Sequence, residues 1–205
     1  MYAGANNVFY LSEYPENPSG YVTLSTSTDW EPWLNAVIPA GLHAGVTSRL
    51  RSNLKHILVG LEMKAALIVP HATRISNRAV LFEPYCQLLT FEFCVGVFSV
   101  CEGIGSALWL RSQNDDGAAA PRISPNNWIG SLVAAADPQG TLDFDIKMRG
   151  VKAVRDKIHQ DQLGARTEID WHAFDYNHAF VPANDALGIV LRLHAASVPA
   201  NTNLG

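Results

Sequence analysis

The feature that most constrains this chain is the segment from Pro84 to Arg111, in which apolar residues occupy nearly all sides of a helix. A helix of this kind lies either in the centre of a helical bundle or across a membrane. Glu92 and Glu102 lie within the segment, and carboxylates near the middle of a bilayer are energetically costly. The sequence therefore predicts the central helix of a bundle, with no membrane partner.

The preceding segment has apolar residues at every third or fourth position, which is typical of an amphipathic helix. These residues are Leu42, Val46, Leu50, Leu54, Ile57, Leu61, Ala65 and Ile68. The pattern predicts one long helix over residues 40–69, ended by Pro70. Shorter helices are expected after a cap at Thr28 or Asp29, from Asn126 or Asn127 to Ala136, from Asp143 to Gly164, and after Pro182.

The sequence predicts an all-α fold, because no stretch alternates between polar and apolar residues across several strands. We expect a single-domain bundle of about five to six helices. Its expected boundaries are an irregular N-terminal arm or small hairpin over residues 1–28, a helical bundle over 29–197 and a loose C-terminal tail over 198–205.

Charge and cysteine content exclude several classes of protein. The formal net charge is -4 and the pI is near 5.9, so the molecule is not a general cationic nucleic-acid binder. Three closely grouped cysteines, Cys86, Cys94 and Cys101, do not suggest a secreted disulfide framework. No signal peptide opens the chain, so we expect a cytoplasmic location. No glycine-rich nucleotide loop or zinc-protease motif occurs, and no cofactor is expected.

The segment from Asp143 to Gly164 combines an apolar helical stripe with two candidate functional residues, Arg155 and His159. Arg155 continues the apolar stripe, and a charge on such a seam requires a partner or a function. His159 follows one turn later on nearly the same face, so Arg155 and His159 could act on one group. The apolar positions are Phe144, Met148, Val151 and Ile158.

The same segment contains a local basic patch. Between residues 147 and 157 there are five basic residues and one acidic residue, Asp156. The basic residues are Lys147, Arg149, Lys152, Arg155 and Lys157. Because the whole chain is negatively charged, a polyanion site must be local, and this patch provides candidate nucleic-acid contacts at Lys147, Lys152 and Lys157. An ordinary solvated helix face is the alternative explanation.

The motif from Arg155 to His159, RDKIH, resembles the hallmark of the HEPN family (higher eukaryotes and prokaryotes nucleotide-binding domains). That family consists of compact helical bundles with an Arg, often followed directly by Asn, Asp or His, and then a His after four to six intervening residues. Here three residues intervene, and Gln160 occupies the position of the His at the shortest usual spacing. The resemblance extends in helix order over residues 84–197.

The resemblance implies metal-independent RNA cleavage at the interface of a homodimer, in a protein of a toxin or defence system. His159 would move a proton during attack by the ribose 2′-hydroxyl. Arg155 would stabilise negative charge on the phosphate, and Asp156 would have an orienting part. The expected partner is RNA or a nucleotide, and the family also includes non-catalytic members that bind nucleotides or proteins.

A structural role for the same motif gives the alternative function. Arg155 could pair with a buried carboxylate such as Glu102, while His159 caps the helix C-terminus, where a cation is favourable. The protein would then be a non-catalytic helical interaction protein.

Two other motifs have simpler explanations. Arg51 and His56 repeat the Arg–His pattern, but they lie in the first long helix, where a solvated face explains them. His172, Asp175 and His178 form HxxDxxH, which gives a third hypothesis, a small metal-binding bundle. The aromatic residues around this motif favour core packing over a metal site.

Overall fold

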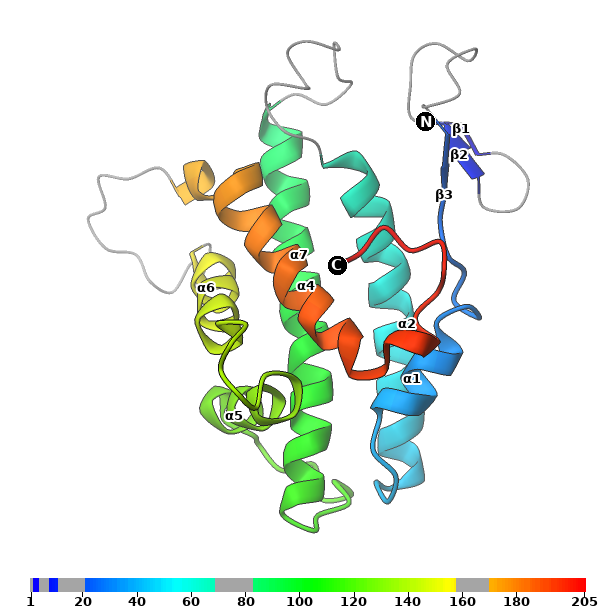
Figure 1. Ribbon diagram of the computed structural model, residues 1–205, viewed down its shortest axis with the longest axis vertical. Coiled ribbons are helices and arrows are strands. Elements are labelled where there is room, and N and C mark those ends of the chain that lie inside the picture. The colour runs from blue at the N-terminus through cyan, green and yellow to red at the C-terminus, as the bar shows by residue number, and fades with distance from the viewer. Residues whose placement is uncertain (1, 4–7, 11–20, 69–82, 158–169) are drawn as a thin grey trace.

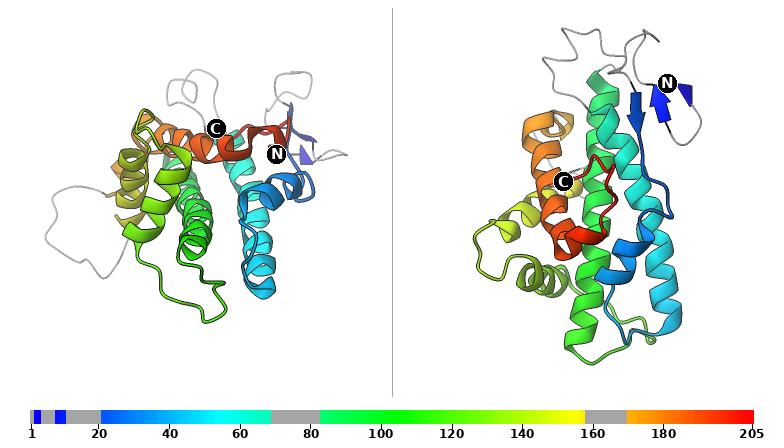
Figure 2. Two further views of the ribbon diagram at one scale, coloured as in Figure 1. Left: turned by 60° about the horizontal axis from the view of Figure 1, so that its bottom comes forward. Right: turned by 45° about the vertical axis from the view of Figure 1, so that its right-hand side comes forward.

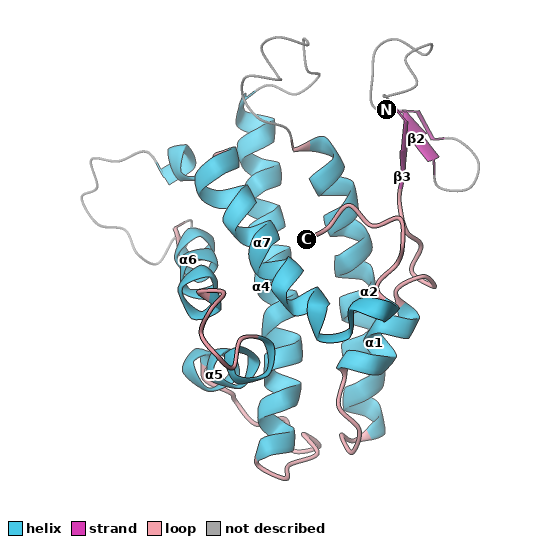
Figure 3. Ribbon diagram, viewed as in Figure 1, coloured by secondary structure: helices cyan, strands magenta, loops and turns pink. Residues whose placement is uncertain are grey.

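The computed structural model describes residues 2–3, 8–10, 21–68, 83–157 and 170–205. Within these ranges the chain forms six α-helices, which confirms the predicted all-α fold class (Figure 3). They are α1 (Glu31–Val37), α2 (Ala44–Leu67), α4 (Glu83–Ser112), α5 (Pro125–Ala136), α6 (Phe144–Asp156) and α7 (Val181–Leu191). The shorter helical segments are η3 (Asp170–Ala173), η4 (Tyr176–Phe180) and η5 (Arg192–Ser197).

α4 is the central helix of the bundle, as its apolar composition predicts. It packs against α2, α5, α6 and α7 and runs along the long axis of the molecule (Figure 1). Phe93, Val97 and Ile104 of α4 are fully buried. Figure 2 shows α5 and α6 on one side of α4 and α1 and α2 on the other, with α7 crossing it.

In the described part of the chain, α4 is the one helix long and apolar enough to cross a membrane, judged by length and composition from Pro84 to Ser112. Its most apolar window is 56% buried by the surrounding helices. The core helix of a soluble protein meets the same criteria, and α4 occupies that position here.

Two glycines of α4 permit close packing of the neighbouring helices. A Cβ atom on Gly103 would lie 2.9 Å from Leu50 Cδ1 of α2. A Cβ atom on Gly105 would lie 2.6 Å from the backbone oxygen of Trp128 in α5. The separation between α4 and α5 therefore depends on the absence of a side chain at Gly105.

The N-terminal residues form a small antiparallel sheet where the sequence predicts an irregular arm or hairpin. Its strands are β1 (Tyr2–Ala3), β2 (Val8–Tyr10) and β3 (Tyr21–Thr23), paired in that order. Ser25 follows β3 and is buried, and its backbone N–H donates to the carboxylate of Glu62 on α2. Glu62 is itself fully buried, so this contact joins the sheet to the helical body.

α1 is held to the C-terminal part of the chain. Trp30 and Trp33 are fully buried, with their ring centroids 5.8 Å apart. The indole N–H of Trp33 donates to the backbone oxygen of Leu191, at the end of α7, at 3.2 Å. α1 also packs against η5, so the beginning and the end of the helical bundle are in contact.

The C-terminal residues pack on the bundle, and the prediction of a loose tail over 198–205 is wrong. Leu204 is buried, and Asn203 Nδ2 donates to the backbone oxygen of Glu62 at 3.1 Å. The backbone N–H of Gly205 donates to Asn184 Oδ1 of α7 at 3.1 Å. Polar groups and a single leucine make these contacts. The tail therefore lacks the regular spacing of apolar residues from which packing is predicted.

The N-termini of α5 and α1 differ from the expected ones in their capping. Ser124, rather than Asn126 or Asn127, caps α5 by accepting the backbone N–H of Asn127 at 3.3 Å. The carboxylate of Asp29 accepts hydrogen bonds from the backbone N–H and the hydroxyl of Thr26, so it does not cap α1.

Candidate functional site

α6, which carries the basic patch, lies on the outside of the bundle against α4, α5 and α7 (Figure 1). Phe144, Met148 and Val151 are buried, as the apolar stripe predicts. The helix ends at Asp156, where the backbone N–H of Lys157 donates to Val154 O at 3.2 Å. The expected end at Gly164 lies outside the described residues.

The N-terminus of α6 is positioned by Asp137, a buried carboxylate that the sequence treats only as part of a turn. Asp137 Oδ1 accepts the backbone N–H of Thr141 at 2.9 Å. Its Oδ2 accepts the backbone N–H groups of Leu142 and Phe144 at 3.1 and 3.2 Å. An anion at a helix N-terminus is favourable. Asp143, directly before the helix, has a φ of 52° and makes no side-chain cap bond.

Replacing Asp137 with alanine is expected to lower the free energy of unfolding by about 2 kcal/mol, because three N–H groups lose their acceptor. Urea denaturation measures this loss. Asp145→Ala is the matched control, since it removes an exposed carboxylate from the first turn of α6 and is expected to cost less than about 1 kcal/mol. Equal losses in the two variants would contradict the anchoring role of Asp137.

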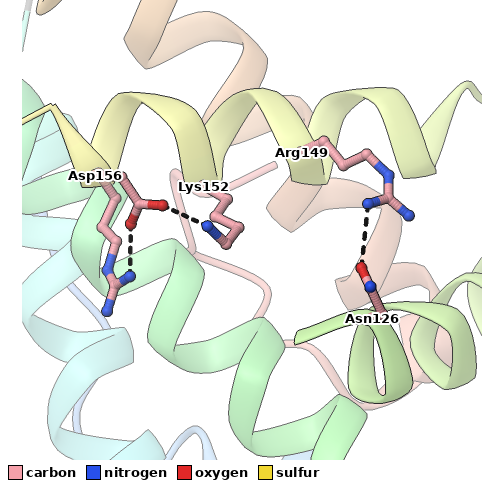
Figure 4. Close-up of polar contacts among 5 residues, drawn as sticks. Asn126, Arg149, Lys152 and Asp156 are labelled. Atoms are coloured by element: carbon pink, nitrogen blue, oxygen red, sulfur yellow. Dashed lines mark hydrogen bonds and ion pairs between the residues drawn. The ribbon is translucent and has the colours of Figure 1, made fainter. Parts of the chain in front are cut away.

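At the C-terminal end of α6, Asp156 binds two cations. Its Oδ2 accepts a hydrogen bond from Lys152 Nζ, and its Oδ1 accepts one from Arg155 Nη1 at 2.6 Å. Figure 4 shows Lys152 directed along the helix toward Asp156. The side chains of Asp156, Arg155 and Lys152 are 26%, 33% and 36% exposed, so solvent reaches the cluster.

The electrostatics of the cluster favour an ionised Asp156. Partial burial raises the pKa of its carboxyl, but the hydrogen bonds from Lys152 and Arg155, with their charges, outweigh that effect. The pKa of Asp156 therefore lies below its ordinary value. At neutral pH the cluster holds two cations and one anion.

Arg155 also lies over the ring of Phe98 in α4, with its Cζ 4.6 Å from the ring centroid. This is the geometry of a cation–π contact. The aromatic face and the carboxylate of Asp156 together fix the guanidinium at the boundary between core and solvent. Phe98 is missed by sequence reasoning, because its meeting with Arg155 depends on how α4 and α6 cross.

The remaining cations of the patch have weaker anchors. Arg149 Nε donates to Asp145 at 2.8 Å, and its Nη1 lies 3.4 Å from Asn126 Oδ1 of α5 (Figure 4). The hydrogen bond from Arg149 to Asp145 raises the pKa of the guanidinium. Lys147 Nζ donates to the backbone oxygen of Leu142 at 3.3 Å. Lys157 is half-buried and follows the last residue of the helix.

The structure assigns the candidate site residues as follows. Arg155, Asp156 and Lys152 come together at one end of α6, while Lys147 lies near its other end. The candidate proton-transfer residue, His159, lies outside the described residues. The alternative pairing of Arg155 with Glu102 is wrong.

Glu102 instead lines a groove between α2 and α4, with a volume of about 530 Å³, together with Asn53 and His56 of α2. His56 and Arg51 of the second Arg–His motif are exposed. His56 Nδ1 lies 2.6 Å from the backbone oxygen of Ser52, one turn earlier. This motif is a solvated helix face.

The described part of the HxxDxxH motif forms a helix cap. Asp175 accepts the backbone N–H groups of Asn177 and His178 at the start of η4. His178 Nδ1 lies 2.8 Å from Asp175 Oδ2, and its side chain is 85% exposed. The side chain of His172 lies outside the described residues. Among the side chains that are described, no three His, Cys, Asp or Glu residues are grouped to hold a metal ion.

The cysteines occupy the core of the bundle. Cys86, Cys94 and Cys101 are buried, and the thiols of Cys94 and Cys101 are free. Burial raises the pKa of the Cys94 and Cys101 thiols to about 12, so neither is a thiolate at neutral pH. A nucleophilic role for these two residues is therefore excluded.

Comparisons of the chain with protein-family models, with curated proteins and with solved structures find no match. The candidate function accordingly depends on the geometry and charge of α6 and on the RDKIH motif.

Proposed function

We propose that this protein is an RNA-directed protein of the HEPN-like type, with α6 as its RNA-contacting surface. The observation that carries the proposal is the charge of this helix. Within α6 four cations, at positions 147, 149, 152 and 155, accompany two carboxylates, Asp145 and Asp156, and the helix is flanked by Asp143 before it and Lys157 after it. α6 is thus electropositive in a chain of net charge -4. A local cationic surface on an acidic protein favours binding of a polyanion at that surface.

The proposed activity is metal-independent RNA cleavage, in a protein of a toxin or defence system. Arg155, held at the edge of solvent, would contact the scissile phosphate and stabilise its developing charge. His159 would transfer the proton of the ribose 2′-hydroxyl. Asp156 would orient Arg155 in the free protein, before RNA binds, through their 2.6 Å hydrogen bond. In this proposal the protein acts as a homodimer in the cytoplasm, where RNA is available.

One observation favours a second candidate function, a non-catalytic helical interaction protein. Arg155 already has two contacts inside the protein, the ring of Phe98 and the carboxylate of Asp156. Such contacts are also what a purely structural arginine makes. In this case RNA is not bound, and removal of Arg155 acts on stability alone.

The test of RNA binding is the triple variant Lys147→Gln/Lys152→Gln/Lys157→Gln, titrated with a fluorescent single-stranded RNA over a range of salt concentrations. We expect the affinity at low salt to fall at least about tenfold. The slope of log affinity against log salt should decrease in magnitude by about 1.4, since each single-strand phosphate contact contributes about 0.7 and Lys152 is already bonded to Asp156.

The matched control removes three cations elsewhere, with the substitutions Lys55→Gln, Lys64→Gln and Arg122→Gln. Lys55 and Lys64 pair with Glu31 and Glu92, far along the chain from α6. We expect this control to retain most of the affinity. Equal losses in both triple variants would refute a site on α6, and absence of RNA binding by the folded wild type would favour the interaction protein.

A further inference from the structure

The Asp156 cluster has the donor arrangement of an anion site that is already occupied. One carboxylate oxygen accepts from Lys152 and the other from Arg155. A phosphodiester likewise presents two non-bridging oxygens on one central atom. Lys and Arg are the side chains that bind phosphate in this way, as charge-assisted donors.

The position of Asp156 adds a second observation. Asp156 is the last residue of α6, where the helix dipole is negative and a carboxylate is unfavourable. The helix itself therefore gains nothing from an acid at this position, and the two cations offset its cost. Because its side chain is 26% exposed, the carboxylate has access to solvent from this site.

Asp145 provides the contrast on the same helix. It lies in the first turn, where an acid is favourable, and a single cation, Arg149, binds one of its oxygens. Asp145 therefore has the features of an ordinary helix-stabilising acid, whereas Asp156 holds two cations of the proposed RNA surface together.

We propose that Asp156 is an internal substitute for a backbone phosphate: it occupies the Lys152–Arg155 pair in the free protein and is displaced when a single-stranded RNA phosphodiester binds. This inference rests on the proposed function of α6 and specifies its regulation. Binding exchanges one anion for another at the same two donors. The internal anion thereby weakens RNA binding and makes it less dependent on salt.

The test compares Asp156→Asn with Asp145→Asn, which remove the same charge from opposite ends of α6. The probe is a fluorescent 20-nucleotide oligouridylate, titrated against each folded variant at several salt concentrations. Asp156→Asn frees two cations, so we expect affinity to rise about fivefold or more and the salt slope to steepen by about 1.4. Asp145→Asn frees one cation away from the cluster, and we expect about a twofold rise.

A double-mutant cycle with Lys152→Gln separates displacement from a general charge effect. In the wild type, Lys152 is occupied by Asp156, so Lys152→Gln should weaken RNA binding by less than about twofold. In the Asp156→Asn background the same substitution should remove most of the gained affinity. If Asp156→Asn does not fold, Asp156→Ser serves in the same cycle, with thermal melts as the check.

Each outcome decides the inference. Equal effects of Asp156→Asn and Asp145→Asn, or a Lys152→Gln effect that is the same in both backgrounds, would overturn it while wild-type RNA binding upholds the proposed function. No RNA binding by any folded variant would overturn both proposals.

Discussion

Alanine at Arg155 or at His159 is expected to reduce EDTA-resistant cleavage of RNA by at least about 100-fold, with the fold intact. Loss of a preorganised charge at the phosphate costs about that factor, and loss of a positioned general base costs a similar one. The measurement is cleavage of mixed RNA oligonucleotides in EDTA, and the products should carry cyclic-phosphate ends, because the ribose 2′-hydroxyl is the nucleophile.

Arg149→Ala is the matched control for this prediction. It removes an arginine from the same helix, but Arg149 contacts Asp145 and Asn126 rather than the RDKIH motif. We expect it to retain cleavage, with weaker RNA binding. No cleavage by the folded wild type, together with a lower melting temperature for Arg155→Ala, would identify Arg155 as a structural residue through its contact with Phe98.

Substituting Gly105 with alanine is expected to produce the largest loss of stability, about 2–3 kcal/mol in the free energy of unfolding. The new Cβ would lie 2.6 Å from the backbone oxygen of Trp128 and 3.0 Å from its Cε3. The contact is with a backbone atom and a fully buried ring, so α5 must move away from α4. Urea denaturation followed by circular dichroism measures the loss.

Gly130→Ala provides the control for helix propensity. Gly130 lies in α5, is exposed, and a Cβ there would meet no atom within 4 Å. Alanine should therefore stabilise the protein by about 0.5–1 kcal/mol. A loss of stability at Gly130, or no loss at Gly105, would contradict the close packing of α4 on α5.

Helix positions were predictable from the sequence because the apolar residues carry the period of the helix. Residues 40–69 and 84–111 correspond closely to α2 and α4, and the apolar composition of the second segment placed it in the centre. Helix ends were less predictable, since several neighbouring residues can cap the same helix. Ser124 and Asn126 are equivalent candidates in the sequence, and only the three-dimensional structure distinguishes them.

The candidate site was predictable as a sequence motif but not as a set of contacts. The sequence identified Arg155 and Asp156, and their hydrogen bond follows from their adjacency. The contact of Arg155 with the ring of Phe98 depends on how α4 and α6 cross. The hydrogen bonds of the Asp137 carboxylate depend on the geometry of the turn before α6. No local pattern encodes such interactions, so the sequence offered Glu102 only as one candidate partner of Arg155.

The hydrogen bond between Trp33 and the backbone of Leu191 affects the order in which the chain acquires its native contacts during synthesis. The two residues are 158 positions apart, so the ribosome makes nearly the whole bundle before the indole of Trp33 finds its acceptor. At about 5–20 residues per second, this interval is roughly 8–30 seconds. Two large aromatic side chains, Trp30 and Trp33, lack their final packing until α7 and η5 emerge. The native packing of α1 is therefore completed only after α7 has been made.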